Sequence, residues 1–129
     1  MFAISNSSEY GLLILEQVKK SNDYLPLSQI VDQLGLPKRF IARVSAELVK
    51  AGLLESKEGK NGGYKLGSKI NQVSLLDYLK IFEDMKLVKC LDKDYNCKYS
   101  RSCNHRQSLH KVYSLILSSL SQYKLSSII

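Results

Sequence analysis

Residues 27–57 read LSQIVDQLGLPKRFIARVSAELVKAGLLESK, and this stretch decides the fold. Apolar residues recur at helical spacing over 27–34, and Gly35 ends that pattern. Pro37 stands where the first turn of a helix tolerates proline, and a second helix continues to Ala51, just before a glycine. Two helices joined by a short glycine-containing turn predict a helix-turn-helix. The buried stripe of its second helix is expected to be Phe40, Ile41, Val44, Leu48 and Val49.

The residues that follow predict a β-hairpin. Residues 53–57 and 64–66 are short strand candidates, and EGKNGG at 58–63 is a glycine-rich turn between them. A hairpin placed directly after a helix-turn-helix is a wing. The fold class expected is therefore mainly α with a small β-hairpin, as a winged helix-turn-helix domain plus a long C-terminal helix.

Helices are also expected on both sides of this unit. Ser7 or Ser8 can cap a first helix, and a fourth helix is expected over residues 74–84. A last helix from about Ser108 carries the apolar stripe Leu109, Val112, Tyr113, Ile116, Leu117 and Leu120. The expected division is a DNA-binding domain at 1–84, a cysteine loop at 85–107 and a dimerisation helix at 108–129.

The basic residues concentrate where a winged helix would meet DNA. The chain has 129 residues and a formal net charge of +7. Its residues 38–69 hold eight Lys or Arg against three Glu, which is the electrostatic pattern of a protein with a polyanionic partner. Arginine reads guanine through two parallel hydrogen bonds, whereas lysine mainly anchors phosphate. The expected DNA contacts are Lys38, Arg39 and Arg43 on the second helix, and Lys57, Lys60, Asn61, Gly62 and Gly63 on the wing. The two glycines are included because they lack side-chain bulk and so permit a close approach to the DNA.

Several classes of protein are not expected. The sequence has no signal-peptide pattern and no apolar run long enough to span a membrane, so we expect a cytoplasmic protein. It has no phosphate-binding glycine loop before a helix and no nucleophile motif, so an enzyme is not expected. Three cysteines within fourteen residues are too few and too odd in number for a disulfide framework in a reducing compartment.

Cys90, Cys97 and Cys103 predict a metal, cluster or thiol-chemistry site. Thiolates are soft ligands that suit iron–sulfur clusters, zinc or copper(I), and the flanking lysines and arginines favour the thiolate form. The gaps between the cysteines are wider than those of most zinc knuckles and lack the close-set runs of ferredoxins. Spacing alone therefore leaves the identity of the bound group open.

Over nearly its whole length the chain resembles the Rrf2 superfamily of bacterial transcription regulators, which includes the IscR, NsrR, RirA and CymR types. The resemblance is carried by Glu9-Tyr10 in the first helix, the turn at Gly35-Leu36, AGLL at 51–54, the wing GGYKLG at 62–67, and the cysteines before a long C-terminal helix. It implies a homodimer whose last helices pair, with each recognition helix and wing meeting one half of a double-stranded DNA operator.

The resemblance also implies a cofactor. Cluster-binding members hold a [2Fe–2S] or [4Fe–4S] cluster on three loop cysteines, whose positions match those of Cys90, Cys97 and Cys103. The fourth ligand varies among them, and Glu9 of the partner subunit and His105 are the two candidates here. The signal sensed would be cluster status, iron, redox state or nitric oxide. Two alternatives remain open: a cluster-free thiol- or zinc-dependent regulator of the same fold, and a small iron–sulfur carrier.

Overall fold

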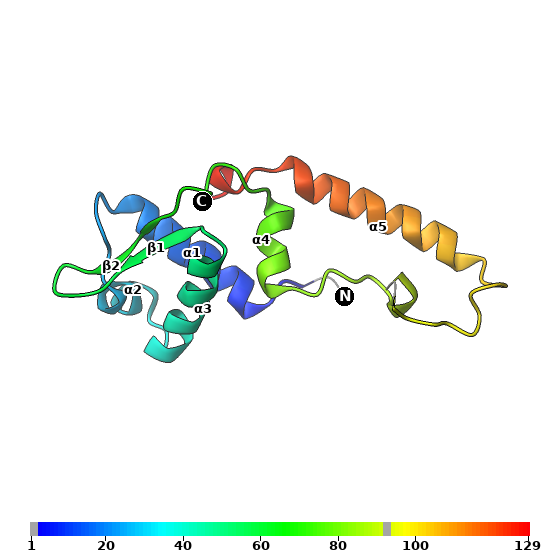
Figure 1. Cartoon of the computed structure of the whole chain (residues 1–129), viewed down its shortest axis with the longest axis horizontal. Helices are drawn as coiled ribbons and strands as arrows, with labels where there is room; N and C mark the ends of the chain where they lie inside the picture. The colour runs from blue at the N-terminus through cyan, green and yellow to red at the C-terminus, as the bar shows by residue number, and fades with distance from the viewer. Residues whose placement is uncertain (1–2, 92–93) are drawn as a thin grey trace.

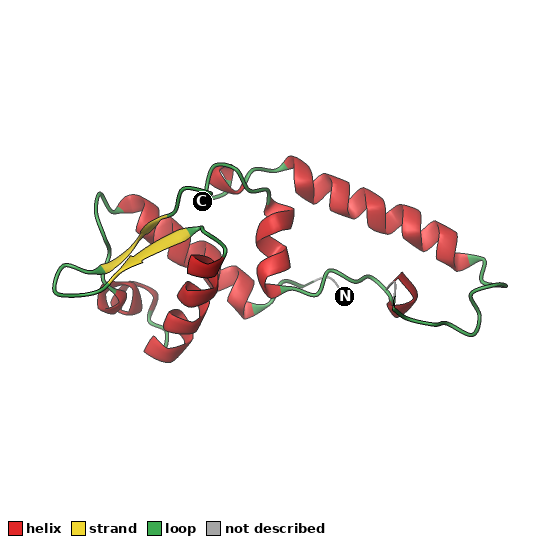
Figure 2. Cartoon of the chain, viewed as in Figure 1, coloured by secondary structure: helices red, strands yellow, loops and turns green. Residues whose placement is uncertain are grey.

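The computed structural model of the chain describes residues 3–91 and 94–129. Its elements in order are α1 (Asn6–Lys20), α2 (Leu27–Leu34), α3 (Lys38–Lys50), β1 (Leu54–Lys57), β2 (Gly63–Leu66), α4 (Leu75–Phe82), the 3₁₀ turn η1 (Lys89–Leu91), α5 (His105–Gln122) and the 3₁₀ turn η2 (Leu125–Ser127). The expected winged helix-turn-helix is confirmed: α2 and α3 precede an antiparallel hairpin. In Figure 1, α5 leads away from this unit to the opposite end of the molecule, and Figure 2 shows how little strand the chain contains.

One hydrophobic core lies between α1, α2, α3 and the hairpin. Ile14 of α1, Ile30 of α2 and Ile41 and Leu48 of α3 are all fully buried. On α3 the buried stripe is Ile41, Val44, Ser45 and Leu48, whereas Phe40 and Val49 are only half-buried at its edges. Because α3 turns this stripe toward α1 and β1, its opposite side is left to solvent.

The first helix begins earlier than the sequence suggested. Ser5, and not Ser7 or Ser8, is the N-cap of α1, and its hydroxyl oxygen accepts a hydrogen bond from the backbone N–H of Ser8 at 3.3 Å. Ser8 lies inside the first turn and is fully buried. Ser5, Ser7 and Ser8 are the same residue type within four positions, so the sequence alone does not choose among them, and tertiary contacts decide which one caps the helix.

The wing is tied to the start of α2. The hairpin pairs Leu54 with Leu66 and Lys57 with Gly63. Tyr64 of β2 also exchanges two backbone hydrogen bonds with Leu25, at 2.8 and 2.9 Å, so the segment before α2 lies alongside the hairpin as an isolated bridge. These bonds hold the wing in a constant position relative to the helix-turn-helix.

The ends of the last two helices also differ from expectation. α4 ends at Phe82 instead of at residue 84, and α5 begins at His105 instead of near Ser108. α4 starts with a reciprocal cap in which Ser74 and Asp77 bond each other's backbone N–H, and these hydrogen bonds from Ser74 lower the pKa of the Asp77 carboxyl. None of the 18 residues of α5 is buried. Within the described residues, no helix combines the length and the apolar character that a bilayer crossing demands.

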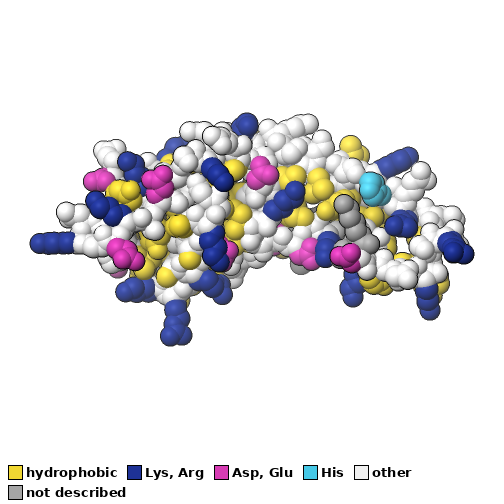
Figure 3. Space-filling view, viewed as in Figure 1, with side chains coloured by type: hydrophobic (Ala, Val, Ile, Leu, Met, Phe, Trp, Pro, Cys, Tyr) yellow, Lys and Arg dark blue, Asp and Glu magenta, His cyan; other side chains and the backbone are white. Residues whose placement is uncertain are grey.

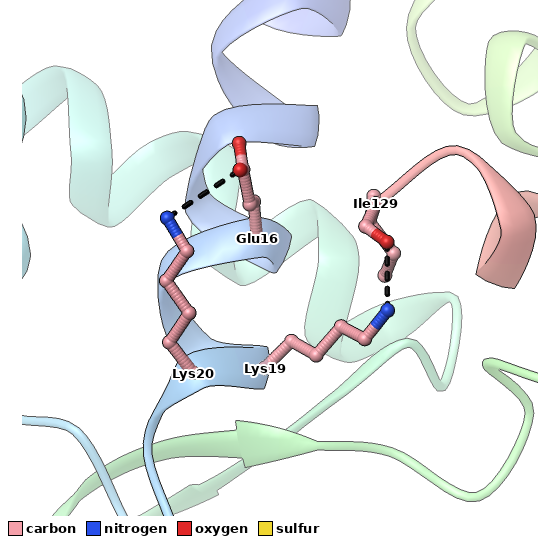
Figure 4. Close-up of polar contacts among 4 residues, drawn as sticks. All are labelled: Glu16, Lys19, Lys20 and Ile129. Carbon is pink, nitrogen blue, oxygen red and sulfur yellow. Dashed lines mark hydrogen bonds and ion pairs between the residues drawn. The ribbon is translucent and has the colours of Figure 1, made fainter.

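The chain returns to the core after α5. Leu125 is fully buried, and its N–H donates to the Val73 carbonyl oxygen at 3.1 Å. The Leu75 N–H donates to the Tyr123 carbonyl oxygen at 2.8 Å. Figure 4 shows Lys19 of α1 donating to the Ile129 carbonyl oxygen at 2.7 Å, beside the ion pair between Lys20 and Glu16 at 3.4 Å. The C-terminal end of α5 is therefore anchored to the winged-helix unit.

Replacing Leu125 with alanine tests this anchor. Leu125→Ala should lower the free energy of unfolding by about 2–5 kcal/mol, because a fully buried leucine is truncated. The measurement is urea denaturation followed by circular dichroism. Ile128→Ala is the control, since Ile128 is 42% exposed and should cost less than about 1 kcal/mol. Equal losses for the two variants would contradict the anchoring role.

Candidate DNA interface and cysteine segment

The outer side of α3 carries exposed cations. Lys38, Arg39 and Arg43 are all exposed. The Arg43 guanidinium lies 5.3 Å from the centroid of the Phe40 ring, a cation–π contact that limits where Arg43 can point. Among the described residues these three cations form no ion pair, so no neighbouring carboxylate neutralises them. In Figure 3, Lys and Arg side chains (dark blue) project from the end of the molecule with α3 and the hairpin, and others lie at the opposite end.

The wing contributes fewer accessible residues than expected. Lys57, Lys60 and Asn61 are exposed, but Gly62 is buried and Gly63 half-buried. A Cβ atom on Gly62 would overlap the Lys57 carbonyl oxygen, and one on Gly63 would overlap the Leu25 carbonyl oxygen. The absence of a side chain at both positions therefore serves packing inside the protein. The close approach to DNA for which the sequence singled out these glycines stays a prediction, and their packing is a separate reason for glycine at both positions.

Tyr24 is a wing contact that the sequence did not reveal. The centroid of its ring lies 5.6 Å from Nζ of Lys57 and 5.9 Å from Nζ of Lys65, so one aromatic ring contacts two wing lysines. A polar hollow of about 450 Å³ opens beside it, lined by residues that include Gln29 and Asn61. The only signal in the sequence was a tyrosine just before the start of α2, which is too common a pattern to single out.

The residues that join α4 to α5, 84–104, are here called the cysteine segment. It contains Cys90 in the turn η1, Cys97 in a turn closed by the Ser100 N–H, and Cys103 just before α5. All three are half-buried free thiols. Asp92 and Lys93 lie outside the described residues. In Figure 1 the segment occupies the end of the molecule opposite the wing.

The donor chemistry of this segment fits an iron–sulfur cluster, but the described conformation does not gather the donors. Three thiols on one segment are the ligand type that such clusters use. Within the described residues, however, no group of three or more Cys, His, Asp or Glu side chains is placed to hold a metal ion. A cluster could be held only if the segment changed conformation.

The two candidate fourth ligands lie on different elements. His105 is exposed and is the first residue of α5, not a loop residue. Glu9 is exposed in the first turn of α1. Cys103 borders a shallow hollow of about 460 Å³ with Arg106, His110 and Lys111, so its surroundings are cationic.

A second carboxylate, which the sequence did not single out, contacts the N-terminal turn of α1, the turn that also carries Glu9. Glu83, at the end of α4, accepts hydrogen bonds from the Ser5 N–H at 2.7 Å and from the Ser8 hydroxyl at 2.5 Å. Those bonds lower the pKa of the Glu83 carboxyl. Desolvation, followed by the nearby charge of Glu83, raises the pKa of Tyr78, which keeps its hydroxyl protonated. An acidic residue at a helix C-terminus is unfavourable in isolation, and that was the available signal for a tertiary partner.

Comparisons with known proteins identify the family and support the fold. The family model "Rrf2: Iron-dependent Transcriptional regulator" matches residues 4–129. The chain is 32% identical over 130 residues to the HTH-type transcriptional regulator NsrR of Bacillus licheniformis, covering 98% of this chain and 91% of that protein. The fold is similar to that of CymR, the global cysteine regulator of B. subtilis, with a TM-score of 0.72, 22% identity and coverage of 99% and 96%. It is also similar to T. potens IscR, with a TM-score of 0.65, 20% identity and coverage of 98% and 85%. The chain thus belongs to the Rrf2 family, whose members are transcription regulators and not enzymes.

Proposed function

We propose that this chain is a homodimeric, DNA-binding transcription regulator of the cytoplasm, and that an iron–sulfur cluster on Cys90, Cys97 and Cys103 sets its affinity for an operator. The observation that carries the proposal is the set of three free, half-buried thiols on one segment beyond the winged helix. The description of the matching family as iron-dependent supports it as well.

In this proposal α3 enters the major groove and the wing contacts the DNA backbone. Arg39 and Arg43 are the candidates for reading bases, because both are exposed on the outer side of α3 and neither forms an ion pair with another described residue. Lys38, Lys57, Lys60 and Asn61 are the candidates for phosphate contacts. Gly62 and Gly63 support the wing from within.

Removing the two arginines tests the recognition helix. The double variant Arg39→Ala/Arg43→Ala should bind the operator at least about tenfold more weakly at fixed salt, because a bidentate arginine–guanine contact contributes roughly 1–3 kcal/mol. Fluorescence anisotropy with a labelled operator measures this affinity. Lys50→Ala is the matched control, because Lys50 lies at the far end of α3 and pairs with Glu47 at 3.5 Å. Undiminished specific binding by the double variant would reject the assignment.

The homodimer is proposed from the surface of α5. Val112 is 47% exposed and Leu115 is 68% exposed on a helix with no buried residue. The other apolar side of α5, with Tyr113, Ile116, Leu117 and Leu120, lines a hollow of about 410 Å³ shared with residues 3–4, 79 and 83–87. An amphipathic helix left this open in a single chain is typical of a subunit interface.

A charge placed on the exposed apolar side should separate the subunits. Leu115→Glu should shift the protein from dimer to monomer in light scattering, because burying an unpaired carboxylate costs several kcal/mol. Ser114→Glu adds the same charge at the neighbouring exposed position, about 100° around the helix, and should leave the dimer intact. A monomeric wild type, or a dimeric Leu115→Glu variant, would contradict the proposed interface.

The cysteine segment would act as the sensor. A bound iron–sulfur cluster supplies redox chemistry and reacts with oxygen or nitric oxide. Cys90, Cys97 and Cys103 would bind it as thiolates, with Glu9 of the partner subunit or His105 as the fourth ligand. To do so the segment would have to draw the three thiols together, and this ordering would shift the positions of α4, α5 and the two recognition helices of the dimer.

Replacing all three cysteines with alanine tests the ligand assignment. Protein purified without air should contain iron and absorb visible light, and the triple variant should lose both signals. Ser102→Ala, beside Cys103, is the control and should retain them. Unchanged iron content and absorbance in the triple variant would show that other residues hold the metal.

A cluster-free regulator is the second candidate. The described residues hold no assembled group of metal ligands, and a structural neighbour is described as a global cysteine regulator. In that case the thiols themselves, or zinc bound to them, would carry the signal. The test uses wild-type protein prepared without air. If this protein contains no iron, and its operator binding responds to thiol oxidation or to zinc, the cluster-free regulator is established in place of the first candidate.

A further inference from the structure

The C-terminal turn of α4 and the N-terminal turn of α1 are joined by a group of hydrogen bonds. Glu83 accepts from the Ser5 N–H at 2.7 Å and from the Ser8 hydroxyl at 2.5 Å. One turn earlier on α4, the Tyr78 hydroxyl donates to the Ser8 carbonyl oxygen at 2.5 Å. Ser8 and Tyr78 are both fully buried. Glu83 itself is half-buried. Three hydrogen bonds, one of them fully buried, therefore join the two turns, which are expected to move together.

The packing around this contact permits little slack. A Cβ atom on Gly11 of α1 would overlap the Tyr78 hydroxyl oxygen, so only glycine lets the tyrosine approach the helix. The Tyr78 ring also packs edge-on against Phe82, with centroids 5.7 Å apart. Glu83 is the C-cap of α4, directly after its last residue Phe82, so the cysteine segment begins immediately after Glu83.

A second set of contacts continues from α1 to the recognition helix. Tyr10, two residues after Ser8, lies edge-on to the Phe40 ring of α3, with centroids 5.7 Å apart. Phe40 also contacts the Arg43 guanidinium, which lies 5.3 Å from the centroid of its ring. A continuous series of contacts thus runs from Glu83 through the first turn of α1 to Arg43.

We infer that Glu83 is a positioning residue that transmits the state of the cysteine segment to the recognition helix through Ser8, Tyr10 and Phe40. The inference deepens the proposed function and rests on it for the signal. Its physical basis is that Glu83 is covalently continuous with the cysteine segment and is hydrogen-bonded to α1. A shift of the segment therefore displaces α1. The aromatic contact between Tyr10 of α1 and Phe40 of α3 then changes the position of Arg43.

Amide hydrogen exchange tests the link without any cluster. In Glu83→Ala, exchange should rise by about tenfold at residues 9–12 of α1 and also at residues 41–45 of α3, while residues 30–34 of α2 stay unchanged. Asp84→Ala is the matched control. It removes the neighbouring carboxylate, which pairs with Lys86 at 3.8 Å and forms no hydrogen bond or ion pair with the described residues of α1. Faster exchange confined to α1, or spread equally over all helices, would overturn the inference.

The conservative variant separates the hydrogen bonds from the mere presence of a side chain. Glu83→Gln keeps an oxygen that can accept from Ser5 and Ser8, so it should restore most of the protection in both helices. If Glu83→Gln behaves like Glu83→Ala in α3 but not in α1, the link from α1 to α3 is refuted.

Operator binding connects the link to the signal. The ratio of Kd values between cluster-loaded and cluster-free protein should fall toward one in Glu83→Ala and stay at the wild-type value in Asp84→Ala. A wild-type ratio of one would reject the proposed function and leave the exchange experiment to decide the inference. If the ratio of Kd values in the wild type is well away from one, and Glu83→Ala has the same ratio, the inference is rejected while the proposed function stands.

Discussion

The burial of one side of α3 is the constraint on which the rest of this protein depends. Ile41, Val44 and Leu48 are at most 1% exposed, so α3 cannot rotate about its axis without returning large apolar side chains to water. Each such side chain contributes roughly 1.5–3 kcal/mol when buried. The cations on the opposite side are therefore displayed in a constant direction, and the hairpin, which packs on the same core, is oriented with them.

The other end of the molecule has no comparable core. α5 contains no buried residue, and the three cysteines are only half-buried. A region with so little apolar burial has a small free-energy difference between its conformations, and a ligand or a partner subunit can then decide which one is populated. The placement of the thiols in this region and not in the core is what would make them suitable for sensing.

α4 is the element at which these two ends meet. Its first residues are bonded to the returning C-terminal chain through Leu75 and Tyr123, and its end is bonded to α1 through Glu83. α4 is only eight residues long, yet it contacts both α1 and α5. A short helix held at both ends can transmit a displacement with little loss, because it has few internal degrees of freedom to absorb it.

The sequence alone was enough to predict the features of the fold that depend on residues close together along the chain. The periodic apolar residues, Gly35, Pro37 and the glycine-rich turn were sufficient to predict the helix-turn-helix and the wing, because helix capping and turn formation involve neighbours within a few residues. The concentration of cations on α3 and the wing, and the three cysteines, could likewise be read directly. For the same reason the start of α1 was misplaced: its choice of Ser5 depends on Glu83.

Contacts between residues far apart in the sequence could be identified only from the folded structure. The hydrogen bonds from Ser5 and Ser8 to Glu83 join positions 78 and 75 residues apart, and no periodicity encodes such a pair. The packing of Gly62 and Gly63 against carbonyl groups, and the separation of the cysteines from an assembled ligand group within the described residues, are of the same kind. Contacts over such distances follow from how the helices pack, which depends on the whole core at once.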